Sequence, residues 1–137
     1  MNASPSAAAG SFAALGLSPT MAAAAAAAGW TVPTAIQQAA IPPILQDRDL
    51  LALAPTGAGK TGAFLLPLLQ RPLAAPGVLD EQPRRLRALV LVPTRELAAQ
   101  TAAAAHALAP QLKTVVAVGG VSINPQMMAL RGGAHLV

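Results

Sequence analysis

The sequence predicts an α/β fold with a parallel sheet whose strands are buried on both faces. Three short apolar runs carry this prediction: residues 49–55 (DLLALAP), 87–93 (RALVLVP) and 113–120 (KTVVAVGG). Each run ends at Pro or Gly and is followed by a segment long enough to form a helix. The runs lack the apolar-polar alternation of half-exposed strands, so they indicate βαβ organisation. The last residues, AHLV at 134–137, are interpreted as the beginning of a fourth strand.

Two helices are predicted before the first strand. Ser18 followed by proline is typical of an N-cap with proline at the first helical position. The alanine run at 22–28 has the highest helix propensity available, and Gly29 suits the end of that helix. A second, short helix is expected to begin at Thr34 and to end before Pro42, because the residue preceding a proline is driven out of the helical region.

The segment after the first strand is expected to be an apolar helix over residues 61–69. The following segment, RPLAAPGVLDEQPRR at 71–85, holds three prolines and is predicted to be one long surface loop. Within it, Asp80 and Glu81 follow no apolar run and are interpreted as a solvated turn.

The composition is that of a globular protein, with 54% hydrophobic and 10% charged residues among 137. The net charge of +4 is compatible with a polyanionic partner, although the basic residues form no long run. The absence of cysteine excludes a disulfide-linked partner and favours a cytoplasmic protein. His106 and His135 are isolated, so we expect no zinc site. The apolar span 12–30 is chiefly alanine and is interrupted by polar residues, so we expect no membrane association.

The stretch APTGAGKT lies directly after the first predicted strand and directly before an apolar helix, as a phosphate-binding loop requires. Gly57 and Gly59 permit the backbone N–H groups to turn inward, and the helix N-terminus adds partial positive charge. Lys60 can reach the β and γ phosphates, and the Thr61 hydroxyl can bind Mg²⁺. The alternative is a glycine-rich turn with a solvated lysine. The loop comprises Ala54, Pro55, Thr56, Gly57, Ala58, Gly59, Lys60 and Thr61.

The segment GWTVPTAIQ at 29–37 resembles the adenine-recognition segment, the Q motif, of DEAD-box RNA helicases. An aromatic residue 17 positions before its glycine is also part of the family pattern, and Phe12 occupies that position. A glutamine amide can donate one hydrogen bond and accept another at the same time, which matches the N6 donor and N7 acceptor of adenine. The alternative is a capping box, in which Gln37 returns a hydrogen bond to the helix start at Thr34. The phosphate loop that follows favours adenine recognition.

Two further motifs extend the resemblance. PTRELA at 93–98 follows the second predicted strand, where a helix N-terminus with Arg95 suits a phosphate, and it resembles the family's motif Ia. The alternative is that Thr94 only caps the helix while Arg95 and Glu96 are solvated or paired. Gly119 and Gly120 close the third strand, where another backbone can approach closely.

The resemblance implies the N-terminal part of a RecA-like P-loop NTPase domain at residues 12–137, incomplete at its C-terminus, after a flexible N-terminus at 1–11. The sequence from LGLSPT through LLPLLQRPL most resembles bacterial members of the family. The implied cofactors are ATP and Mg²⁺, and the implied partner is the RNA sugar-phosphate backbone. ATP contacts are implied for Phe12, Trp30, Thr34, Gln37 and residues 54–61, with Lys60 and Thr61 as catalytic residues. RNA contacts are implied for Pro93, Thr94, Arg95, Glu96, Gly119 and Gly120.

Hydrolysis in this family requires an acidic motif after a buried strand, and no apolar run of this chain ends in Asp or Glu. A second RecA-like domain is also needed. The resemblance therefore implies an ATP-dependent RNA helicase when complete, and we expect this chain alone to bind ATP, and RNA backbone, without hydrolysis. The alternatives are a non-catalytic ATP- or RNA-binding module and an unrelated P-loop ATPase.

Overall fold

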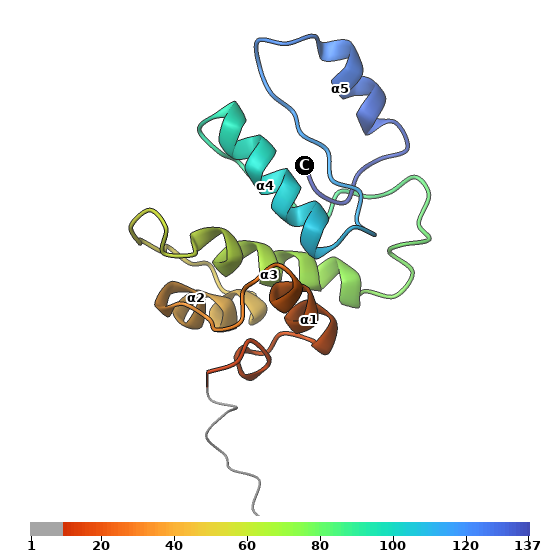
Figure 1. Ribbon diagram of the computed structural model, residues 1–137. Helices are drawn as coiled ribbons and strands as arrows, with labels where there is room; N and C mark the ends of the chain where they lie inside the picture. The colour runs from red at the N-terminus through yellow and green to blue at the C-terminus, as the bar shows by residue number, and fades with distance from the viewer. Residues whose placement is uncertain (1–9) are drawn as a thin grey trace, which may run out of the picture. The chain divides into compact units, whose positions relative to one another are not determined.

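The computed structural model describes residues 10–137 (Figure 1). The chain divides into two compact units, Met1–Arg71 and Pro72–Val137. The expected flexible N-terminus at 1–11 falls mostly on residues 1–9, which lie outside the described residues. Each unit is considered by itself.

The first unit is helical. A 3-10 helix, η2 (Ala13–Leu15), precedes α1 (Pro19–Ala27), and Ser18 Oγ accepts a hydrogen bond from the Met21 amide over 3.2 Å. The predicted N-cap and first helix are therefore confirmed. The unit's core contains these buried apolar residues: Phe12, Leu17, Met21, Ala25, Ala40, Ile41, Ala63, Leu65, Leu66 and Leu69.

The second helix, α2 (Ala35–Leu45), begins after Thr34 as expected but does not end before Pro42. It continues through both prolines, so the predicted boundary was wrong. Proline fixes φ in the helical range, but in a helix interior it removes one backbone hydrogen bond and its ring crowds the carbonyl four residues earlier. The Ile41 side chain is fully buried, and the Gln46 amide closes the last turn on the carbonyls of Pro42 and Pro43. Burial outweighs the local preference of a residue before proline.

Residues 49–55 do not form the strand that their composition predicts. No bridge joins them to another segment within residues 10–137. Leu51 and Leu53 are each 87% exposed, so this run is not buried on both faces. A strand is stabilised by backbone pairing with a neighbour, and the described residues provide none here.

The helix after the phosphate loop, α3 (Lys60–Ala74), begins one residue earlier and ends five residues later than predicted. It therefore takes the first four residues of the predicted loop 71–85. Gln70 on α3 accepts from the Ser18 amide over 2.7 Å and donates to the Gly16 carbonyl over 3.1 Å. These two bonds hold the turn before α1 against α3.

The second unit contains a small parallel arrangement of three segments rather than regular strands. Within residues 10–137 the bridges are isolated: Arg84 to Gly133, Ala88 to Leu136 and Thr114 to Leu136, all parallel. Leu136 pairs on both sides, so the C-terminal run 134–137 lies between the other two segments. The predicted fourth strand thus forms the centre of this arrangement, and its parallel direction is confirmed.

Two helices complete the second unit. Helix α4 (Arg95–Leu108) follows Thr94, whose Oγ1 accepts from the Leu97 amide over 3.1 Å. Helix α5 (Ile123–Leu130) follows the glycine pair. No helix within the described residues is long and apolar enough to cross a membrane.

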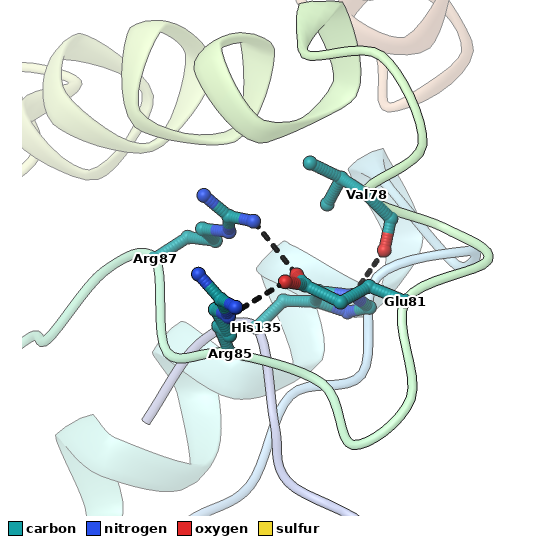
Figure 2. A network of polar contacts seen from close by, with 5 residues as sticks. All are labelled: Val78, Glu81, Arg85, Arg87 and His135. Atoms are coloured by element: carbon teal, nitrogen blue, oxygen red, sulfur yellow. Dashed lines mark hydrogen bonds and ion pairs between the residues drawn. The ribbon is translucent and has the colours of Figure 1, made fainter.

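The predicted surface loop is partly anchored (Figure 2). Val78 is buried, and the backbone carbonyl oxygen of this residue lies 3.2 Å from His135 Nε2. Glu81 binds Arg87 over 2.7 Å and Arg85 over 2.8 Å, and its side chain is 22% exposed. The interpretation of Glu81 as a solvated turn residue was therefore wrong, because two guanidinium groups converge on its carboxylate.

Candidate functional site

The two glycines of the phosphate loop take backbone conformations with positive φ. Gly57 and Gly59 have φ of 83° and 88°, which only glycine adopts readily. The Ala58 amide donates to the Pro55 carbonyl over 3.2 Å and closes the turn. Lys60 Nζ donates to the Ala54 carbonyl over 2.8 Å, so the lysine side chain spans the loop from the start of α3 to the loop's first residue.

Gln37 links α2 to this loop. Its Oε1 accepts from the Thr34 amide over 2.9 Å, which completes the capping box that sequence reasoning offered as an alternative. Its Nε2 donates to the Gly59 carbonyl over 3.1 Å. A primary amide has two N–H donors and two acceptor lone pairs, so one of each remains. Capping and ligand recognition are therefore compatible for this side chain.

The Q motif and the phosphate loop share one cavity of about 350 Å³. The predicted residues that line it are Trp30, Thr34, Gln37, Gly57, Gly59 and Thr61. Cavities of this size hold small ligands, and this one combines an aromatic ring, an amide and a helix N-terminus.

Gly62 also lines this cavity and was not among the predicted site residues. A Cβ on Gly62 would lie 2.7 Å from Gln37 Nε2 and 3.0 Å from Trp30 Cζ3. The missing side chain lets the Trp30 ring and the Gln37 amide approach the first turn of α3. A glycine directly after the Lys-Thr pair, inside an expected helix, was the available signal. Thr31 and Val32 also line the cavity and were not predicted.

Other predicted ATP-contact residues lie outside the cavity lining. Phe12 is 4% exposed and belongs to the core beside η2. The remaining loop residues Ala54, Pro55, Thr56, Ala58 and Lys60 belong to the phosphate loop but do not line the cavity. Their contacts with a nucleotide remain predictions.

The predicted RNA-contact residues gather in the second unit. Pro93, Thr94, Arg95 and Gly119 line a cavity of about 310 Å³ beside α4, together with apolar residues of the three paired segments. Glu96 and Gly120 do not line it. The Arg95 guanidinium lies against the Gly120 backbone, because a Cβ at Gly120 would lie 3.0 Å from Arg95 Cζ and closer still to one guanidinium nitrogen. Gly120 has φ of 74°. Gly120 therefore permits the close approach of an arginine side chain, whereas a Cβ on Gly119 would meet nothing within 4 Å.

A magnesium site made of protein carboxylates is not found in the part of the chain that the structure describes, since no three His, Asp or Glu side chains cluster there. Thr61 faces the cavity and offers one hydroxyl oxygen, a ligand type that Mg²⁺ accepts. The cavity therefore offers a magnesium ion one hydroxyl oxygen, and its other ligands would have to come from a bound nucleotide or from water.

A glycine-containing loop with a Lys-Thr pair lies between an apolar run and helix α3, and Gln37 bonds to this loop. This arrangement defines a P-loop domain of the α/β class. The DEAD/DEAH box helicase family matches residues 34–137, and the chain belongs to this family.

Particular relatives agree with this assignment. The chain is 48% identical over 111 residues to the probable ATP-dependent RNA helicase DDX47 of Homo sapiens, covering 80% of this chain and 23% of that protein. It is similar to a crystal structure of a DEAD box protein from Methanococcus jannaschii (34% identity, TM-score 0.78), covering 93% of this chain and 34% of that one. It is also similar to the RNA helicase Prp28 from Chaetomium thermophilum bound to ADP (39% identity, TM-score 0.74), covering 92% of this chain and 31% of that one.

These likenesses confirm the predicted family and the RecA-like fold class. The chain spans about a quarter of the length of the curated relatives it matches. The expected likeness to bacterial members in particular has no support among these relatives.

Proposed function

We propose that this chain forms the ATP-binding face and an RNA-backbone contact of an ATP-dependent RNA helicase that locally unwinds or remodels RNA duplexes. The observation that carries the proposal is the cavity in which Trp30 and Gln37 meet Gly59 and Thr61. The helicase names of the relatives and the ADP-bound relative support it.

ATP binding is assigned to the first unit. The unused donor and acceptor of the Gln37 amide suit the N6 and N7 edge of adenine, and Trp30 offers an apolar face. The Lys60 ammonium group donates to the carbonyl of Ala54, the first residue of the loop. When a nucleotide binds, the ammonium group can replace this acceptor with phosphate oxygens. Mg²⁺ bound to ATP and to Thr61 would neutralise phosphate charge.

RNA binding is assigned to the second unit. Thr94 caps α4, so the first turn of this helix presents backbone N–H groups and partial positive charge. The Arg95 side chain is exposed and unpaired with any carboxylate among residues 10–137. Such a site contacts phosphates without reading base sequence.

Hydrolysis and unwinding are assigned to the whole protein, in the cytoplasm, with a second RecA-like domain. This chain has no carboxylate cluster in its described part to orient a metal and a water molecule. A second candidate function, a binding module without turnover, is favoured by this same observation. Magnesium-dependent ATP turnover by the 137-residue chain, above that of a Lys60→Ala variant, would contradict the expected inactivity of the isolated chain.

Trp30 provides a direct test of ATP binding, because it is the only tryptophan of the sequence and the chain has no tyrosine. Its fluorescence should change on titration with ATP and Mg²⁺, and to a smaller extent with GTP. Gln37→Ala should lose the preference for ATP over GTP, and Lys60→Ala should weaken the binding of both nucleotides. The matched control is Gln38→Ala, whose amide bonds, among residues 10–137, to the Pro33 carbonyl alone. Equal responses to ATP and GTP in the unmodified chain would remove the adenine assignment.

A further inference from the structure

The end of the paired segment that contains Thr114 is held by one side chain from α5. Gln126 Oε1 accepts from the Val118 amide over 2.8 Å, and Gln126 Nε2 donates to the Val118 carbonyl over 3.0 Å. The same nitrogen lies 3.2 Å from the Ser122 carbonyl. A primary amide offers an acceptor and a donor side by side, so it takes the place that a residue of a neighbouring strand would occupy.

These contacts of Gln126 with Val118 and Ser122, called the Gln126 clamp below, enclose the glycine pair. Gly119 and Gly120 follow Val118 directly, and Ser122 precedes α5. The turn between Val118 and Ser122 is therefore tied to Gln126 at both ends. Glycine has more backbone freedom than any other residue, so a turn containing two glycines gains most from such an external tie.

The glycine pair in turn bears on Arg95, whose guanidinium lies against Gly120. Within the described residues no carboxylate fixes this guanidinium. The guanidinium therefore lies against a backbone turn whose two ends, Val118 and Ser122, both bond to Gln126.

We propose that Gln126 is a positioning residue for RNA: by clamping Val118 it fixes the turn at Gly119 and Gly120 and so presents the Arg95 guanidinium to a phosphate. This inference rests on the proposed RNA contact of the second unit. Gln126 itself contacts no RNA, and its effect on binding passes through Arg95.

The first test is amide hydrogen exchange in the 137-residue chain carrying Gln126→Met, which keeps the side-chain length but removes the hydrogen bonds. Exchange of the Val118 amide should accelerate about tenfold or more, as expected for the loss of one to two hydrogen bonds. Exchange of the Val115 amide, which bonds to the Leu136 carbonyl, should not change. Gln126→Glu should retain protection at Val118, since a carboxylate oxygen still accepts from its amide. Unchanged exchange at Val118 in Gln126→Met would overturn the clamp.

The second test is a double-mutant cycle on the affinity for a fluorescein-labelled oligouridylate. Gln126→Met should weaken binding by about tenfold, whereas the exposed control Gln111→Met should not. In an Arg95→Ala background, Gln126→Met should have no further effect, because the two residues act in series. Additive losses would overturn the positioning role while leaving the RNA contact. If Arg95→Ala binds as tightly as the unmodified chain, the proposed RNA contact and the positioning role both fail.

Discussion

The side-chain nitrogen of Gln37 donates a hydrogen bond to the carbonyl oxygen of Gly59 over 3.1 Å, which ties the start of α2 to the phosphate loop. The same side chain caps α2 through the Thr34 amide. Gln37 is 3% exposed, so both contacts are shielded from water. Any change at this residue is expected to affect the loop as well as the helix.

Gln37→Met should therefore destabilise the chain by about 1–3 kcal/mol, because it leaves the Thr34 amide without its partner. It also removes one of the two hydrogen bonds to the Gly59 carbonyl, which still accepts from the Ala63 amide. Urea denaturation measures this change. Gln38→Met, the neighbouring exposed glutamine, should cost less than about 1 kcal/mol. Equal effects of the two substitutions would show that the link to the phosphate loop adds no stability.

Gly62→Ala should separate stability from nucleotide binding. Alanine favours a helix over glycine by about 1 kcal/mol, which opposes the cost of the new contacts. A Cβ 2.7 Å from Gln37 Nε2 displaces the amide, and one 3.0 Å from Trp30 displaces the ring. We expect a melting temperature close to that of the unmodified chain, a shifted Trp30 emission and weaker ATP binding. Gly10→Ala, where a Cβ meets nothing within 4 Å, is the control. ATP affinity equal to that of the control would contradict the role assigned to Gly62.

His135→Ala should destabilise the second unit. The His135 ring is 1% exposed; its Nδ1 accepts from the Lys113 amide over 2.9 Å, and its Nε2 lies 3.2 Å from the Val78 carbonyl (Figure 2). Loss of the ring leaves a cavity and two backbone groups without partners, at a cost of about 2–5 kcal/mol. The comparison is His106→Ala on the exposed face of α4, which should change the free energy of unfolding by no more than about 0.5 kcal/mol.

Acid should weaken the second unit through Glu81. The hydrogen bond from Arg87, with the charges of Arg87 and Arg85, holds the pKa of Glu81 below its ordinary value of 4.5, against the opposing effect of burial. Since the folded pKa lies below the unfolded one, the stabilisation is present above the unfolded pKa and is lost as pH falls through the folded pKa.

Glu81→Gln should consequently lower stability at pH 7 and make the acid dependence below about pH 4.5 shallower. Chemical denaturation at a series of pH values measures both effects. Asp80→Asn, on the exposed neighbour, should leave the acid dependence as it is. If the Glu81→Gln variant has the same acid dependence of stability as the unmodified chain, this ion-pair cluster does not contribute to that dependence.

Local signals predicted much of the fold. Ser18 with its proline, the alanine run and the Thr34 cap each act within one helical turn, so the helix starts could be found without tertiary information. The end of α2 could not, because burial of Ile41 decides it. The strands could not either, because pairing depends on distant segments, and Leu136 joins Ala88 and Thr114 only in the folded unit.

The sequence by itself determined the phosphate loop, the Q motif and the family, because these depend on residue types at short, fixed spacing along the chain. Tertiary structure alone decided that Gln37 bonds to Gly59, that Gly62 admits the Trp30 ring and that Gln126 clamps Val118. These contacts join residues through the directions of side chains and backbone groups in space. A hydrogen bond is formed by geometry, and the order of residues in a chain does not specify that geometry locally.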